Sequence, residues 1–478
     1  MGLTSALISA RSGILGAQAA IDVVSRNIAS ASTEGYTRKI HNQSTLVVGG
    51  TGQGIQIDEV TRQVTEGLQR EVRQQTAVVE ELEVIDDFLG RLEQQFGRPD
   101  DQSSISAKLT DLKDAYQALA TTPEDVSTQI AVVTAAQELA RSFNDLNNQI
   151  QGLRRDADAR IDDQVNEINT AMANIDSLND EIGQRQALGQ STADLKDQRD
   201  QLLLEVNEKL SITSFERPGG EISVFAPGGN LMLDDTRLAL SFSTTSTYTA
   251  ATTGQAVQIN TGTTNVSIST DISNGDGSLA GLLRIRDTLL PTIQTALDDL
   301  AFEVATNFGT VNVNGTNENV NLFTDAGGLT PPGAFTQGFA GTIQVRTAIT
   351  NTPTLIADPQ TAAGFTPVGP GDPSIPLAIL GVFEAQQALS LAPTVNNTME
   401  GFFANLIGTV ANQKADFESQ LTFQTNFRDG LRDRFNDESA VNTDQELSEL
   451  IRLEAAFSAS ARVLTTVQRA VDDLVRAI

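Results

Sequence analysis

The stretch NIASASTEGYTR, residues 27–38, ends the most regular apolar pattern in the chain. Upstream of it, apolar residues recur at alternating intervals of four and three positions, which is the spacing of a coiled-coil seam. Ser, Thr and Gly then interrupt the pattern, so the sequence predicts one helix over residues 3–29. The apolar positions of this helix are Leu3, Leu7, Ala10, Ile14, Ala17, Ile21, Val24 and Ile28.

The other end of the chain carries a matching stripe that begins at Leu450. One such stripe would ordinarily face the core of its own domain. Two strict repeats at the extreme ends are less ordinary, because chain ends are where order usually fades. We therefore expect the two end helices to pair as a coiled coil. The apolar positions at this end are Leu450, Leu453, Phe457, Leu464, Val467, Val471, Leu474 and Ile478, with Ser460 as a polar interruption.

Three apolar residues beside the N-terminal stripe, Ile8, Leu15 and Val23, widen it beyond a two-helix seam. Pairing of the two ends would leave this flank in water, and most helical stability comes from packing. We expect neighbouring copies of the same chain to cover the flank. On this hypothesis the end helices become fully ordered only on assembly.

The middle of the chain alternates between helical and strand-like character. Short alternating runs such as EISVF and NVSIS, between Gly, Asn and Thr turns, predict strands from about 216 to 277. Residues 309–374 are poor in charge and rich in Thr, Asn, Gly and Pro, so they could form an exposed β module or an irregular segment. Amphipathic periodicity predicts helices over residues 62–96, 104–121, 124–187, 191–206, 279–308 and 376–435.

This order of elements predicts a mainly α fold with an inserted β module. The chain ends would meet at one pole, a long helical bundle would follow, and the β insertion would lie outward. The three predicted domains are a terminal coiled coil (1–62 with 440–478), a helical domain (63–210 with 278–308 and 376–439) and a β-rich outer insertion (211–277 with 309–375).

Composition excludes several classes of function. The formal net charge of −29 argues against nucleic-acid binding, which needs clustered cations. The chain has no cysteine and one histidine, His41, so disulfides and zinc sites built from Cys and His are impossible. Neither a P-loop nor a GxSxG elbow occurs. We expect no enzyme activity, no metal and no cofactor.

The sequence also argues against a membrane segment. Its apolar runs are shorter than a spanning helix, and Arg11, Asp22 and Arg26 interrupt the first 30 residues. These residues lack the arrangement of a cleavable signal peptide. We therefore expect neither membrane insertion nor a cleaved signal.

The interrupting stretch resembles a signature of the axial proteins of the bacterial flagellum, close to N-I-A-N-x-x-T-P-G-Y. Asn27, Thr33, Gly35 and Tyr36 match that signature, whereas Glu34 replaces the usual Pro. The segment GIQIDEVTR (54–62) is similar to the one that follows in many of these proteins.

Internal stretches resemble, more specifically, the hook-associated protein 1 family, and they occur in the same order. The ends alone would indicate only a flagellar axial protein. The resembling stretches are LEQQFG (92–97), DLKDQRDQLL (194–203), GEISVFAPGGNLMLD (220–234), GSLAGLLRIRDTLLPTIQTALDDLA (277–301) and AVNTDQELSELIRLEAAFSASARVLTTVQ (440–468).

The resemblance implies a structural subunit of the extracellular flagellum at the junction between hook and filament. Such subunits are exported unfolded through the flagellar type III apparatus and polymerise through their terminal helices. The implied partners are copies of the chain in a ring, the hook protein below, the second junction protein above and an export chaperone. The alternatives are a hook or rod subunit, a non-flagellar coiled-coil surface scaffold, and a secreted hydrolase that uses carboxylates.

Overall fold

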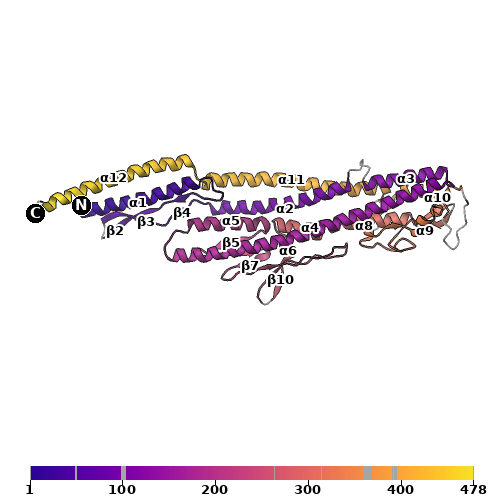
Figure 1. The fold of residues 1–478 in the computed structure, drawn as a ribbon, viewed down its shortest axis with the longest axis horizontal. Helices are drawn as coiled ribbons and strands as arrows, with labels where there is room; N and C mark the ends of the chain where they lie inside the picture. Colours follow the sequence, from indigo (N-terminus) through magenta and orange to yellow (C-terminus); the bar gives the residue numbers. More distant parts are fainter. Residues whose placement is uncertain are drawn as a thin grey trace.

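The structure, a computed structural model, describes residues 2–48, 51–97, 104–262, 264–313, 315–358, 369, 371–389, 391 and 396–476. The molecule is elongated, and both chain ends lie at the same end of its long axis (Figure 1). A pair of helices forms that end, and long helices with small sheets along them form the rest. The predicted mainly α fold with inserted strands is confirmed.

The helix pair consists of α1 (Leu3–Ser30) and α12 (Thr443–Arg476), which run antiparallel along each other as the two stripes predict. A hairpin of β2 (Gln43–Val48) and β3 (Thr51–Ile57) lies beside α1. The short strands β1 (Lys39–Ile40) and β4 (Thr61–Arg62) pair with each other. We call α1, these four strands and α12 the terminal unit, and the remainder of the molecule the body.

The body is built along α4 (Val126–Ala187), whose 62 residues span about 90 Å at 1.5 Å per residue. Helices α3 and α5 pack against α4, and α11 packs against α2. A π-helical turn, Ile285–Leu289, joins α7 to α8. The bounds of these helices are α2 (Glu66–Phe96), α3 (Ile105–Thr121), α5 (Ala193–Lys209), α6 (Ser269–Ser273), α7 (Ser278–Arg284), α8 (Leu290–Asn307), α9 (Thr347–Asn351), α10 (Ser374–Glu384) and α11 (Met399–Ser439).

Capping residues fix where the helices of the α3–α4 hairpin begin. The Ser104 side chain accepts a hydrogen bond from the Ala107 amide at 3.2 Å, and the Asp125 carboxylate accepts one from the Ser127 amide at 2.8 Å. Gly189 follows the end of α4 with φ of 67°, the left-handed conformation that ends many helices. Between its ends, α4 buries one complete stripe that includes Ile150, Ile161, Ile168 and Ile175.

The strands of the body form small antiparallel sheets. The predicted EISVF and NVSIS strands are β6 and β10 in two separate three-stranded sheets. Residues 309–374 combine short strands with short helices, and 314, 359–368 and 370 lie outside the described residues. The sheets are β5 (Thr213–Glu216)–β6 (Ile222–Ala226)–β7 (Asn230–Leu233), β8 (Leu240–Ser241)–β9 (Gln258–Asn260)–β10 (Asn265–Ser267), β11 (Thr310–Val313)–β12 (Thr316–Asn319), β13 (Phe323–Thr324)–β14 (Gln344–Val345) and β15 (Gln387–Ala388)–β16 (Asn396–Asn397).

One continuous apolar core runs through the body and includes no residue of α1 or α12 among those described. The helices predicted over 376–435 are α10, which ends at Glu384, and α11, which begins at Met399. The strands β15 and β16 lie between them. The three domain boundaries stay predictions, but the core already separates the terminal unit from the body.

Candidate assembly site

Two contacts define the register of α1 and α12. A Cβ atom at Gly13 would lie 3.1 Å from Ser460 Oγ, and Asn27 Nδ2 donates to Glu446 Oε2 at 2.9 Å. The two contacts are 14 residues apart on each helix, so they report one antiparallel register over two heptads. Small residues on α1 let the helices approach closely. The sequence-predicted seams are therefore brought together.

The seam residues are buried to different degrees. On α1 the small ones, Ala10, Ala17 and Val24, are buried, and Leu7, Ile14, Ile21 and Ile28 are half-buried. On α12, Val467 is buried and Leu450, Leu453, Phe457 and Leu464 are half-buried. The side chain of Leu3 and the whole of Ile478 lie outside the described residues. The pairing thus covers the seams only partly.

The C-terminal end of α12 projects past α1. In the register set by Gly13 and Ser460, the residues after 470 have no α1 residue opposite them. Accordingly, Val471 and Leu474 are 40% and 53% exposed. Figure 1 shows the C-terminus beyond the N-terminus along the same axis. This overhang leaves the last turns of the predicted seam bare.

Apolar side chains also remain exposed away from the seam. On α1, Ile8 and Leu15 are 40% and 49% exposed, as predicted for the flank of the stripe. Val23 is buried, so the expectation of an exposed flank is wrong at that position. It lines a groove together with Ile40 and His41, where the chain of β1 returns along α1 and covers it. The outer face of α12 exposes Leu447, Ile451 and Val463.

A groove of about 330 Å³ lies between α1, α12 and the strands of the terminal unit. Its floor is made of small α1 residues such as Gly16 and Ala20, and Ile55 of β3 reaches over Gly16, where a Cβ atom would clash with it. Charged groups, among them Arg38 and Glu449, lie at its rim. The groove combines an apolar floor with a polar edge, which is the usual composition of a protein-binding surface.

Asn27, in the signature turn, is fully buried and uses its whole side-chain amide. Its Oδ1 accepts from the Lys39 amide and from the Tyr36 hydroxyl, both at 3.0 Å. Its Nδ2 donates to the Lys39 carbonyl and to Glu446, both at 2.9 Å. Glu446 in turn accepts from Arg38 Nε at 2.6 Å. The Asn27 side chain thus joins α1, the returning chain and α12.

The other signature residues shape the turn between α1 and β1. Gly35 has φ of 72°, and a Cβ atom there would collide with the side chain of Gln201. The Tyr36 amide donates a hydrogen bond to the carbonyl of Thr33, which is exposed. The Lys39 ammonium lies 4.0 Å from the centre of the Tyr36 ring. Burial, reinforced by the charge of Asp194, raises the pKa of Tyr36 to about 12, so its hydroxyl stays a donor to Asn27.

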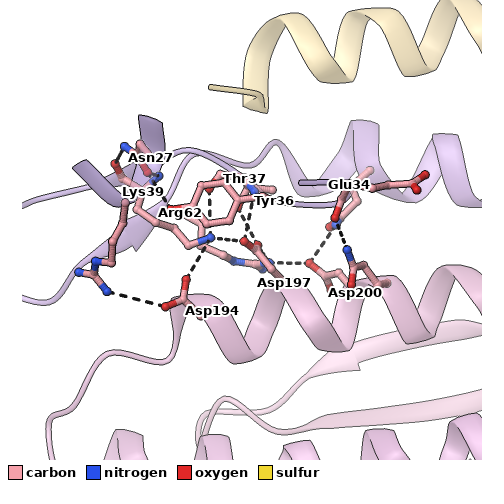
Figure 2. Close-up of polar contacts among 12 residues, drawn as sticks. Asn27, Glu34, Tyr36, Thr37, Lys39, Arg62, Asp194, Asp197 and Asp200 are labelled. Atoms are coloured by element: carbon pink, nitrogen blue, oxygen red, sulfur yellow. Dashed lines mark hydrogen bonds and ion pairs between the residues drawn. The ribbon is translucent and has the colours of Figure 1, made fainter. Parts of the chain in front are cut away.

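Three aspartates on one face of α5 lie against this turn and the strands next to it (Figure 2). Asp197 accepts hydrogen bonds from the Thr37 amide, the Thr37 hydroxyl and Arg62, at 3.1, 2.7 and 2.9 Å, and it also pairs with Lys39. Asp200 accepts from Arg62 at 2.7 Å. Asp194 lies 3.6 Å from Lys39 and is mostly exposed. Figure 2 shows these carboxylates below the turn that carries Tyr36 and Thr37.

The cations of this cluster respond to their surroundings in different ways. Burial alone would lower the pKa of Arg62, but Asp200 and Asp197 outweigh it and the pKa is raised. Burial lowers the pKa of Arg73, which Asp200 at 3.9 Å offsets only in part. Arg62 is therefore held firmly as a cation between two carboxylates.

Known proteins are similar to this chain in both sequence and fold. Residues 89–325 match the family model described as the helical domain of flagellar hook-associated protein FlgK. The flagellar hook-associated protein 1 of Bacillus subtilis is 24% identical over 98% of this chain and 97% of its own length.

In sequence and fold the chain matches the flagellar hook-associated protein 1 family.

Other members of the family match over part of their length. The hook-associated protein 1 of Escherichia coli is 28% identical over 64% of this chain, and the match spans 57% of that relative. The flagellar hook junction protein FlgK from Burkholderia pseudomallei has the same fold, with a TM-score of 0.62 and 14% identity, over 76% of this chain and 99% of that structure. This last likeness concerns the fold alone.

Sequence reasoning does not single out the acidic row on α5 as a site, although its stretch carries part of the family resemblance. A signal is present, since Asp194, Asp197 and Asp200 follow one another at intervals of three, which places them on one side of a helix. The sequence signal for the burial of Glu446 is weaker. It consists only of the position of Glu446, four residues before Leu450, the first residue of the C-terminal stripe. Its partner Asn27 is predicted only as part of the signature.

The composition of α1 bears on the expectation of no membrane insertion, which stays a prediction. Within the described part of the chain, Thr4–Ser30 is long and apolar enough to cross a membrane by length and composition, with mean hydropathy 1.3. Uninterrupted apolar runs do not reveal this, because Ala and Gly residues between the larger apolar ones raise the average. In the structure α1 packs against α12 and β3, and 33% of its most apolar window is buried.

The described residues include no group of three His, Asp or Glu side chains arranged to hold a metal ion. His41 is half-buried, and burial lowers its pKa despite the nearby Asp58. The expected absence of metal and cofactor stays a prediction. What the family shows is a structural flagellar protein.

Proposed function

We propose that this chain is a structural subunit of the junction between flagellar hook and filament, which polymerises through its terminal unit. Its match to the hook-associated protein 1 family supports the place of action. The observation that carries the assembly mechanism is the incomplete burial of the paired seams. Large apolar side chains of a single copy stay exposed on α1, on the outer face of α12 and on its overhang.

The geometry of the terminal unit supports a side-by-side arrangement of copies. The antiparallel pair brings both seams to one pole of the molecule (Figure 1). Exposed apolar side chains at one pole are stabilised when another apolar surface removes them from water. Copies in a ring would supply that surface, with the hook protein below and the second junction protein above. An export chaperone would hold the end segments before secretion, and the assembled subunit would be extracellular.

A deletion strain tests the place of action. We expect cells that lack this chain to lose motility and to release filament protein into the medium, because the filament has no base to attach to. Complete loss of filament-protein secretion would instead indicate a hook or rod subunit. Unchanged motility would contradict the flagellar role and favour a surface scaffold.

Charged substitutions in the seams test the assembly mechanism. We expect Ile14→Asp and Leu464→Asp to prevent incorporation, because an unpaired charge buried in a seam costs several kcal/mol. Ile130→Asp and Leu188→Asp are matched controls, since both positions are exposed apolar residues of α4 or its end. The body of every variant should unfold as in the unchanged chain. Normal incorporation of both seam variants would contradict the mechanism.

Hydrogen exchange tests whether assembly completes the order of the end helices. We expect amides of α1 and α12 near the chain ends to gain protection on assembly, because neighbours cover their apolar flanks. The buried stretches of α4 serve as an internal reference that should not change. Full protection of both chain ends in the dilute single copy would argue against folding on assembly.

A further inference from the structure

The terminal unit and the body are joined without apolar helix packing. Among the described residues, α1 has substantial contacts with α12, β1 and β3, but neither α1 nor α12 has substantial contacts with α2, α4 or α5. The continuous core of the body also stops short of both helices. The chain crosses between the two parts at residues 63–65 and 440–442, and the turn at residues 31–38, between α1 and β1, lies against α5. Something other than core packing must therefore fix their relative orientation.

Polar contacts connect the terminal unit to the body instead. Lys39 is held on both sides of the joint: its backbone pairs with Asn27 of α1, and its buried ammonium pairs with Asp197 of α5. Thr37 binds the same carboxylate through both its amide and its hydroxyl. Asp197 thus has four donors from the terminal unit and the turn that leads into it, two on each oxygen, which uses the full acceptor capacity of a carboxylate.

The neighbours of Asp197 make this residue the centre of the joint. Asp200 shares Arg62 with it and also accepts from Gln69 of α2 at 2.9 Å. Asp194 is 61% exposed in its side chain, and its ion pairs with Lys39 and Arg26 are long, at 3.6 and 3.9 Å. Surface pairs of that kind contribute little. A cavity of about 90 Å³ lined by Asp197, Asp200 and Phe435 borders the joint, so the contact is not closed by dense packing.

We infer that Asp197 is the positioning residue that fixes the orientation of the terminal helix pair on the body of a single copy. Glu446 has the complementary role inside the terminal unit, where it binds α12 to Asn27 and Arg38. Loss of Asp197 leaves the buried Lys39 ammonium with the exposed Asp194 alone and leaves Arg62 with Asp200 alone, while the contacts between α1 and α12 stay intact. The helix pair then swivels as a unit. The inference concerns one molecule and does not depend on the proposed assembly.

Distance measurements between spin labels test the inference on the full chain. The chain has no cysteine, so spin labels attach only at the introduced cysteines. Ala459→Cys on α12 combined with Ser177→Cys on α4 reports across the joint, and Ala459→Cys combined with Ser25→Cys on α1 reports within the helix pair. All three positions are exposed. In the unchanged background we expect a narrow distribution for both pairs.

Removal of the Asp197 carboxylate should affect one pair of labels and not the other. We expect Asp197→Ala to broaden the distribution across the joint by at least about two-fold, because breaking a buried ion pair leaves charges that must reach water. Asp197→Asn, which keeps the size, should broaden it less. The distribution within the helix pair should stay unchanged in both variants, which shows that the terminal unit is folded.

Asp194→Asn is the matched control on the same face of α5, and we expect it to change neither distribution. The inference is overturned if the distribution across the joint is already broad in the unchanged background. It is equally overturned if both Asp197 variants leave that distribution narrow. Broadening within the helix pair as well would show that Asp197 stabilises the terminal unit itself, which also contradicts a positioning role. Failure of seam variants to block incorporation would affect the assembly proposal only.

Discussion

The body and the terminal unit use the same helical pattern but complete it differently. In α4 the apolar stripe is fully buried, and its isoleucines at 150, 161, 168 and 175 are removed from solvent. In α1 and α12 the stripes are as regular, yet most of their larger residues are only half-buried. The comparison teaches that periodicity specifies which side of a helix is packed. The number of partners decides how completely it is packed, and a single copy gives the terminal helices too few.

The largest expected difference lies in the cost of core truncation. We expect Phe143→Ala in α4 to destabilise the body by about 3–5 kcal/mol, because the side chain is fully buried and contacts Phe403 edge to face. Leu464→Ala in α12 should cost far less in the single copy, since that residue is only half-buried. Denaturant unfolding measures both. Equal costs would show that the terminal seam is as complete as the body core.

A smaller effect is expected from the polar anchor of the helix pair. Glu446→Ala leaves the buried Asn27 amide without one acceptor, which costs about 1–3 kcal/mol. We expect faster hydrogen exchange around Asn27 and Glu446, with no change in α4. Glu449→Ala, one turn further along α12 at a half-buried position, is the control. Faster exchange throughout the body would mean that the two regions unfold together.

The turn between α1 and β1, which lies against the body, should be sensitive to a single methyl group. Gly35→Ala places a side chain at a positive φ and against Gln201, so we expect a loss of about 1 kcal/mol or more. Gly67→Ala is the control, because a Cβ atom there meets nothing within 4 Å and the position is helical. Thermal unfolding compares the two. A neutral Gly35→Ala variant would contradict the need for glycine in this turn.

The smallest expected effect is spectroscopic. The chain has three tyrosines, and burial is the first cause that raises the pKa of each: Tyr36 and Tyr248 to about 12, and Tyr116 further still. An alkaline absorbance titration should therefore show little phenolate near pH 10 while the protein is folded. The folded pKa of each tyrosine exceeds its unfolded pKa. The contribution of these groups to the free energy of unfolding is therefore complete below pH 10 and is lost as pH rises toward 12. Tyr36→Phe should remove only the absorbance change of the Tyr36 phenol, which lies at the joint.

The sequence predicts most of the architecture because the strong periodic signals are local. The pairing of α1 with α12 and the long body helices follow from the spacing of apolar residues. The register of the pair does not follow, since a heptad seam matches itself after every shift of seven, and the buried Asn27–Glu446 contact distinguishes the observed alignment. The burial of Val23 depends on where β1 returns along α1, a tertiary contact that no local pattern contains. Strands of two residues, such as β13, are likewise set by their surroundings.

The shared pole of the two chain ends has a practical consequence for labelling. A fluorescent protein fused to either end would crowd the region where neighbours are proposed to meet. The loop after β7 offers another attachment point on the flank of the body, where the Asp235 side chain is 85% exposed. An insertion there would carry a reporter into a polymer without occupying the end surfaces. Tolerance of that insertion, beside intolerance of end fusions, would make the position of the contact surface visible in living cells.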